Sequence, residues 1–468
     1  MKPTLWQPST ALSTKEEQVL KRMKKAKLFV FLRKQRHEIF DEAFQNELAT
    51  LSQDSKRGHP PIAPAQLALA TLLQAYMGVS DDEVIEATVM DRRWQLVLDC
   101  LDSEQAPIRL GTLVGFRGRL IEAQMDRRLI ERTIELGEHS GAFGSRALRA
   151  ALDSSPLWGA GRVEDTYNVV GHALRKVMSV IAAQREWELA EVAQEAGAEV
   201  VCGSSLKANL DRDWDQTTQK EEALSLVLTT LTQVEDGQMR HGRKSRSVRV
   251  DGYKRHVLHD MDSGLVRAVG VTAANAPEAS VTEAISADLD HQAVTLQELH
   301  IDRAYLSSHW VRTRSPELEV YCKAWPVRQG KQFSKQAFHL DWERQIICCP
   351  AKLEMPFTPG GVVHFPKKSC VQCPLQAQCT TSPKGRSVSI HPDEALLVEL
   401  RQRQLTPAGR AQLRERVAVE HTLAHIGHWQ GERARYRGLR KNLFDLRRCA
   451  VIHHLHVLAR SEPFLQAA

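Results

Sequence analysis

The sequence predicts a mixed α/β core that is preceded by an all-helical region. Apolar residues recur at helical spacing through residues 64–76 and 112–136. From residue 147 onward, short apolar segments typical of strands alternate with helical patterns. The intervening stretch, residues 137–145, contains Gly and Ser and indicates a flexible junction. This order favours a mixed sheet carrying insertions rather than a single helical bundle.

Composition describes an ordinary globular protein. The chain has 468 residues, of which 42% are hydrophobic and 26% are charged, so it has room for several domains. No apolar run reaches the roughly 18 residues that a membrane span needs. The N-terminus lacks the apolar core of a secretory signal. We therefore expect a cytoplasmic protein without a membrane partner.

Local signals define the helical region. Pro64 suits the first turn of a helix, and Gly78 is expected to end it. Ser80 can cap the next helix, residues 81–90, with Glu83 completing a capping box. A further helix is expected over residues 112–136. Residues 1–60 are predicted to form a helical basic arm, and residues 61–140 a helical DNA-binding domain.

The α/β core is predicted over residues 146–325. A strand at residues 147–152 runs into Asp153, and a helical insert follows at about 163–236. Further elements are expected as strands at 247–260, 264–273, 298–301 and 318–323, with a helix at 279–290. A Cys-rich insert, residues 326–392, interrupts this core. Helices at 407–429 and 442–458, within residues 393–468, are expected to complete it.

Three acidic residues stand out as candidate catalytic groups. Asp153 and Asp302 each follow a candidate strand, and Glu420 lies in a predicted helix. Three carboxylates from separated segments can hold two divalent cations about 3.5–4 Å apart, and such a pair cleaves phosphodiesters. Oxygen ligands suit Mg²⁺ or Mn²⁺. Spacing alone leaves a second interpretation open, because an Asp after a strand is often a turn or a helix cap.

Several motifs resemble those of insertion-sequence transposases of the DDE class. Tyr76-Met77-Gly78-Val79-Ser80-Asp81-Asp82-Glu83 is similar to the helical domain that opens many of them. The other matching motifs are Gly252-Tyr253-Lys254-x-His256, Ile301-Asp302-Arg303-Ala304-Tyr305, Arg416-x-x-x-Glu420 and Arg435-Tyr436-Arg437-Gly438. The sequence departs from the family signature at Leu413, where Tyr is usual, and at Gly427, where Lys is usual. Ala304 likewise stands in place of Gly.

The resemblance implies a fold, a chemistry and partners. The core would have the RNase H-like fold, with Asp153 as the first acid, Asp302 as the second and Glu420 as the third, together holding two Mg²⁺ or Mn²⁺ ions. The enzyme would cleave DNA at terminal inverted repeats and join the ends to target DNA, as a homodimer on DNA associated with the nucleoid. Asp251 and Asp262 are rival metal ligands, although Asp262 is interpreted as a turn residue.

Two other functions stay open from the sequence. One is a catalytically inactive DNA-binding protein derived from a transposase. The other is an RNase H-like nuclease that cleaves but does not transfer strands.

Basic residues cluster in three places, at residues 15–27, 240–255 and 431–448, in a chain whose net charge is +6. Each cluster alone is equally well explained as a solvated face, but three in one chain favour a polyanionic partner. Arg416, four residues before Glu420, should share its helix face and either orient that carboxylate or contact a phosphate. The candidate DNA-binding residues are Arg416, Lys254, Arg433, Arg435, Arg437, Arg440 and Lys441. Trp429 and Tyr436 are candidates for stacking on a base or for packing.

Five of the nine cysteines lie within residues 348–379. Cys349, the Cys370-Val371-Gln372-Cys373 pair and Cys379 have spacing suited to a structural tetrahedral Zn²⁺ site, in which Cys348 could substitute for Cys349. The alternative is a set of small buried residues. His421 and His425 also have ligand spacing, but the absence of Glu after His421 excludes a metalloprotease motif. We interpret them as core or DNA-facing histidines.

Overall fold

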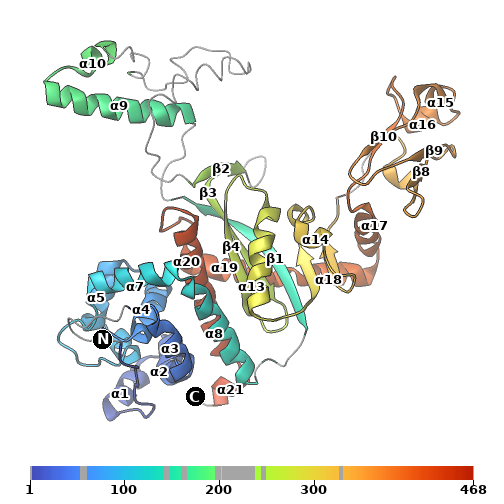
Figure 1. Cartoon of the computed structure of the whole chain (residues 1–468). Helices are drawn as coiled ribbons and strands as arrows, with labels where there is room; N and C mark the ends of the chain where they lie inside the picture. Colours follow the sequence, from blue (N-terminus) through green and yellow to red (C-terminus); the bar gives the residue numbers. More distant parts are fainter. Residues whose placement is uncertain are drawn as a thin grey trace.

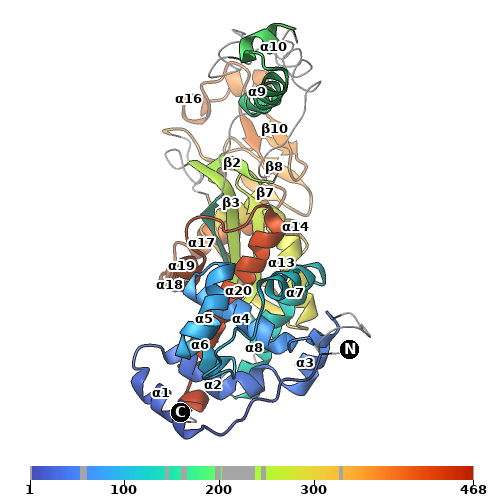
Figure 2. The same cartoon turned by 90° about the vertical axis from the view of Figure 1, so that its left-hand side faces the viewer.

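The computed structural model describes residues 3–52, 61–141, 143, 147–159, 166–195, 202, 238–243, 249–325 and 330–466. Figure 1 shows a helical part, a central sheet and two projections, and both termini lie in the helical part. The projections leave the sheet at the end away from the helical part in both Figure 1 and Figure 2. Within the described residues, no helix is both long enough and apolar enough to cross a membrane.

The helical part begins with eight helices: α1 Thr14–Arg22, α2 Lys27–Ile39, α3 Glu42–Ala49, α4 Pro64–Met77, α5 Asp81–Met90, α6 Arg92–Val97, α7 Leu110–Glu122 and α8 Met125–His139. The expected start of α4 at Pro64 and its end at Gly78 (φ 73°) are confirmed. Ser80 and Glu83 form the predicted capping box of α5.

One predicted helix is in fact two. The expected helix at 112–136 breaks between α7 and α8, where Gln124 adopts a left-handed conformation with φ 55°. The apolar spacing continued through the break because both helices bury their apolar faces in the same core, through Phe116 and Leu120 of α7 and Ile130 of α8. Periodicity alone therefore did not reveal the break.

Helices α1 to α3 pack into the helical core instead of standing apart as an arm. Phe29 and Leu32 of α2 are buried there, as is Leu48 of α3. Some of the basic charge of this region also points inward. Arg33 is ion-paired with Glu16 at 2.6 Å, and Arg36 donates to the carbonyl oxygens of Leu96 and Val97.

The central sheet has six strands: β1 Leu148–Trp158, β2 Arg240–Arg243, β3 Arg249–Asp260, β4 Val266–Ala273, β5 Leu296–Ile301 and β6 Glu319–Cys322. The strand order is β2-β3-β1-β5-β6. The sixth strand, β4, pairs with β3 farther along that strand, after the residues that pair with β2. β3 is antiparallel to β1, β2 and β4, whereas β5 and β6 run parallel to β1. This mixed sheet confirms the expected RNase H-like α/β core.

Helices cover both faces of the sheet. One face packs against α19 (Val417–Gln430) and α20 (Leu439–Leu458), in the same core cluster as the helical part. The other face packs against η2 (Glu278–Val281) and α13 (Thr282–His291), with α14 (His309–Arg312) and α17 (Glu394–Arg403) beside them. The remaining helical segments of this part are η3 (Arg303–Tyr305), α18 (Pro407–Glu415) and α21 (Glu462–Gln466).

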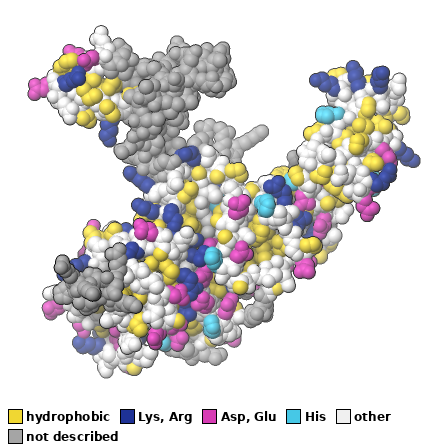
Figure 3. Space-filling model, viewed as in Figure 1, with side chains coloured by type: hydrophobic (Ala, Val, Ile, Leu, Met, Phe, Trp, Pro, Cys, Tyr) yellow, Lys and Arg dark blue, Asp and Glu magenta, His cyan; other side chains and the backbone are white. Residues whose placement is uncertain are grey.

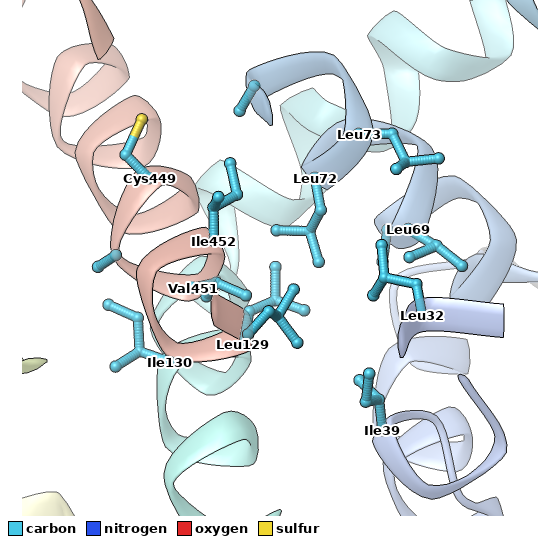
Figure 4. Packing of buried hydrophobic residues seen from close by; sticks show 14 of the residues in the cluster. Leu32, Ile39, Leu69, Leu72, Leu73, Leu129, Ile130, Cys449, Val451 and Ile452 are labelled. Carbon is cyan, nitrogen blue, oxygen red and sulfur yellow. The ribbon is translucent and has the colours of Figure 1, made fainter. Parts of the chain in front are cut away.

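Helix α20 joins the helical part to the sheet. It contacts α4 and α8 on one side and β4 on the other. Figure 4 shows Ile452 and Val451 of α20 packed with Leu129 of α8 and Leu72 of α4. Because one continuous core extends from the N-terminal helices through α20 to the sheet, the two parts stabilise each other.

The C-terminal helices differ in detail from the prediction. The expected helix at 407–429 is divided into α18 and α19, which meet at a turn at Arg416. The next helix begins at Leu439 instead of residue 442.

The two projections correspond to the two predicted insertions. Helices α9 (Thr166–Arg185) and α10 (Leu189–Glu195) lie within the predicted helical insert, most of whose remainder falls outside the described residues. The second projection, which we call the Cys module (residues 330–392), contains two small sheets and short helices. Its elements are η4 Lys335–Ala337, β7 His339–Asp341, β8 Ile346–Cys348, β9 Glu354–Pro356, β10 Val362–His364, α15 Lys367–Val371, α16 Gln376–Cys379 and β11 Ser387–Ser389.

Replacing Ile452 with Ala should lower the free energy of unfolding by about 2–5 kcal/mol, because it leaves a cavity where α20 meets both parts. Urea unfolding followed by circular dichroism measures this change. Leu465→Ala, at a side chain that is 57% exposed, is the control and should change stability by less than about 0.5 kcal/mol. Equal effects of the two substitutions would contradict the central place of α20.

Candidate active site

The pairing of β1 with β5 sets two aspartates side by side. Leu152 pairs with Ile301, and both side chains are buried on the α13 face of the sheet. Because side chains alternate along a strand, the following residues, Asp153 and Asp302, belong to the opposite face, which α19 covers. The expectation that the strand ends at residue 152 was wrong. Only the pairing with β5 ends there, whereas β1 continues to Trp158 paired with β3.

Arg416 links the third acid to the first. Its Nη1 atom lies 2.7 Å from Oδ2 of Asp153, and its Nη2 atom lies 3.0 Å from Oε1 of Glu420. Glu420 lies in the first turn of α19, directly after the turn at Arg416. The prediction that Arg416 and Glu420 share one helix face is confirmed, and the guanidinium also reaches across to the sheet.

All three acids line one pocket. Its wall includes Asp153, Asp302 and Glu420, together with the basic residues Lys254, Arg255 and Arg416 and a further acid, Glu278. Burial raises the pKa of Asp153, and the nearby negative charges of Asp302 and Glu420 raise it further, against the opposing effect of Arg416. The carboxylates are therefore close enough to repel one another, and a cation between them would relieve that repulsion.

The acidic side chains of this pocket fit a hard divalent cation, because each of them would bind the ion through oxygen. Within the described part of the chain, however, no three Asp, Glu, His or Cys side chains already stand in coordinating geometry, either here or elsewhere. In this pocket Arg416 supplies the positive charge that bridges Asp153 and Glu420.

The motif Gly252-Tyr253-Lys254-x-His256 lies in β3, and its Lys254 lines the pocket. At Gly252 (φ 153°) a Cβ atom would lie 2.3 Å from the backbone nitrogen of Gly159, so only glycine allows this close approach. Lys254 Nζ donates to the carbonyl oxygen of Ala276 at 2.9 Å. His256 is buried and pairs through Nδ1 with the Tyr305 hydroxyl at 2.8 Å, and through Nε2 with the Thr272 hydroxyl at 2.9 Å.

Arg255 is a pocket residue that sequence reasoning did not single out. It is only 6% exposed, and it donates to the Ser155 hydroxyl at 2.6 Å and to the Gly431 carbonyl oxygen at 3.0 Å. A Cβ atom at Gly427 would lie 3.2 Å from its Nη2 atom. Arg255 thus brings its guanidinium to the position where the family signature usually has lysine. Its place in a basic cluster was the only sequence signal.

The basic residues after α19 divide into two groups. Arg433, Arg435, Arg437 and Lys441 are exposed. Arg440 instead forms an ion pair with Asp126 at 2.6 Å, and the buried Arg448 pairs with Asp445 at 2.6 Å. Arg440 therefore joins α20 to α8, whereas the pair of Arg448 and Asp445 lies within α20. In the second cluster, residues 244–248 lie outside the described residues.

The rival acids lie outside this pocket wall. Asp262 follows β3 in a turn, where it is ion-paired with Arg149 at 3.0 Å, as its interpretation as a turn residue implies. Asp251, within β3, does not line the pocket either.

The two aromatic candidates and His425 take part in packing, whereas His421 is exposed. The Trp429 ring stacks on His456, with 5.2 Å between ring centroids and 8° between planes. Tyr436 lies under the guanidinium groups of Arg117 and Arg448. His421 and His425 are both exposed on α19, and His425 contacts Trp429.

Four cysteines of the Cys module surround a second pocket. Cys349, Cys370, Cys373 and Cys379 all line it, whereas Cys348, in β8, is not part of its wall. All nine cysteines are free thiols.

Comparison with known families gives two matches. Residues 349–459 match a family model described as Transposase DDE domain, and residues 18–119 match one described as Transposase domain (DUF772). The first segment contains Arg416 and Glu420, and the second contains most of the helical part. Searches of the curated proteins and of the solved structures found no match.

The buried His256 should make folding sensitive to acid. Burial lowers its pKa to about 3, from 6.5 in the unfolded chain. Below pH 6.5 the unfolded chain therefore binds a proton that the folded chain does not, and stability falls as the pH drops toward 3. His256→Gln should reduce this slope by up to about 1.4 kcal/mol per pH unit.

The measurement is urea unfolding at several pH values between 6.5 and 4. Thr272→Val is the control, because it removes a hydrogen-bond partner but keeps the imidazole, so it should lower stability without reducing the slope. An unchanged slope in His256→Gln would mean that this histidine is not held neutral.

Proposed function

We propose that this chain, a transposase of the insertion-sequence DDE class, cleaves DNA at its element's ends and joins the freed 3′ ends to target DNA in the pocket lined by Asp153, Asp302 and Glu420. The observation that carries the proposal is the convergence on one pocket of three acids, one in β1, one directly after β5 and one in α19. These segments are far apart in sequence, and the sheet register and α19 bring them together.

Asp153, Asp302 and Glu420 would hold two Mg²⁺ or Mn²⁺ ions. When bound, such a pair activates a water molecule or a 3′-hydroxyl and stabilises the leaving oxygen of a phosphodiester. Support comes from the oxygen ligands that the three acids offer and from the raised pKa of Asp153, which burial raises most and the nearby charges of Asp302 and Glu420 raise further.

Arg416 would have two roles. Without metal, its two-point contact holds the carboxylates of Asp153 and Glu420 at a common position between sheet and helix. Once those carboxylates bind cations, the guanidinium becomes available for a phosphate of the DNA, which it can contact with two parallel hydrogen bonds. Lys254 and Arg255 line the same pocket and would position the DNA backbone without reading its sequence.

A wider basic surface would bind the rest of the DNA. The exposed Arg433, Arg435, Arg437 and Lys441 would contact phosphates, and Arg440 would position α20 through Asp126. Figure 3 shows Lys and Arg side chains gathered at the outer end of the Cys module, where Lys367, Lys368 and Lys384 are exposed. Since both ends of an element must meet, we propose a homodimer on the DNA.

Asp302→Asn should abolish Mg²⁺- or Mn²⁺-dependent cleavage of a duplex carrying the terminal repeats, lowering the rate by about 100-fold or more, because the amide no longer supplies a charged ligand. Gel analysis of end-labelled DNA measures the cleavage. Asp262→Asn is the matched control, since that aspartate lies outside the pocket wall, and it should cleave like the wild type.

The same assay separates the alternatives. Equal cleavage by the wild type and by Asp302→Asn would exclude Asp302 from the site. Binding without cleavage by the folded wild type would favour the inactive DNA-binding protein. Cleavage without joining of a precut end to target DNA would favour a nuclease.

Arg416→Gln should strengthen the binding of Mn²⁺ in the absence of DNA, because the ion no longer competes with a guanidinium for Asp153 and Glu420. Since Glu420 is half exposed, the gain is modest, on the order of 1 kcal/mol or about fivefold. Calorimetric titration measures the affinity, and Arg416→Lys should lie closer to the wild type. Weaker binding by Arg416→Gln would contradict the competition.

A further inference from the structure

We infer that the Cys module is held together by one structural Zn²⁺ ion bound to the thiolates of Cys349, Cys370, Cys373 and Cys379. These four side chains line one pocket of the module, beside the short helices α15 and α16. The inference is independent of the proposed DNA chemistry, because the module has its own core and the acidic pocket lies in the central sheet.

The small core of the module creates a need for such a site. Its buried cluster comprises Phe338, Ile347, Phe357, Val363, Phe365, Val388 and Ile390. Every strand of the module is three residues long. A domain of roughly 60 residues buries a smaller fraction of its surface on folding than a larger domain does, and domains of this size commonly rely on a disulfide or a metal for stability. All the cysteines are free thiols, so no disulfide stabilises the module and a bound metal ion is the remaining way to stabilise it.

The four sulfur atoms come from separate local structures. Cys349 directly follows β8, Cys370 lies in α15, Cys373 follows α15, and Cys379 ends α16. Cys349, Cys370 and Cys379 also pack against the module's core. One ion bound to all four would therefore connect the three-stranded sheet to both short helices.

One backbone donor contacts a cysteine of this pocket. The backbone N–H of Leu353 donates to Sγ of Cys349 at 3.3 Å, and this contact orients the sulfur within the pocket. On binding, each thiol would release its proton to solvent, and four thiolates at about 2.3 Å would complete a tetrahedral Zn²⁺ site. Because no coordinating group is preformed in the described residues, the side chains would close around the ion.

The test is the zinc content of the full-length protein, measured by mass spectrometry after gel filtration. It uses the Asp302→Asn variant as the parent, so that the acidic pocket does not contribute. The parent should hold about one zinc ion per chain. Cys349→Ser should lose most of it, whereas Cys348→Ser, which changes the adjacent thiol outside the pocket wall, should keep it.

Two further measurements keep the inference testable if Cys349→Ser fails to fold. Cys373→His should retain zinc, because histidine is also a zinc ligand, whereas Cys373→Ser should not. The protein loaded with Co²⁺ should show the thiolate charge-transfer and visible absorption of a tetrahedral site. A parent without zinc, loss of zinc from Cys348→Ser alone, or disulfides between these cysteines would overturn the inference. Cleavage activity does not enter any of these readouts.

Discussion

The parallel pairing of β1 with β5 is the constraint on which the candidate site depends. In this register Leu152 pairs with Ile301. The next residue along each chain segment, Asp153 or Asp302, therefore faces the same side of the sheet. A shift by one residue would turn one aspartate into the apolar layer beneath α13. Burial of Leu152 and Ile301 on that side therefore fixes the position of the acids on the other.

Helix packing supplies the third acid. Helix α19 lies against β1 and β3, and its buried Val419 and Leu423 flank Glu420, which is left on the pocket side. Helix α20 packs beside α19 and contacts both α8 and β4, so the helical part of the chain supports the position of α19. This arrangement explains why two segments at opposite ends of the sequence, both similar to transposase domains, belong to one folded core.

Sequence patterns predicted most helices and strands. They did not predict the breaks within helices or the contacts between residues far apart in sequence. The capping box at Ser80 and the strand directly before Asp302 depend on local chemistry, so the sequence sufficed to predict them. The breaks at Gln124 and Arg416 escaped prediction because apolar periodicity continues across them. Arg255 escaped because its role depends on Gly427, a residue 172 positions away that leaves room for its guanidinium. Arg440 appeared to be a surface charge because nothing local indicates its pairing with Asp126.

The central claim is that Asp153, Asp302 and Glu420 surround one pocket that binds divalent cations. The most direct test replaces Mg²⁺ with Fe²⁺ in the folded protein and adds ascorbate and peroxide, so that radicals formed at the bound iron cut the nearby polypeptide. The account predicts three cuts, adjacent to residues 153, 302 and 420, that disappear when excess Mg²⁺ is added. Cuts confined to other segments, or cuts near only one of these residues, would contradict it.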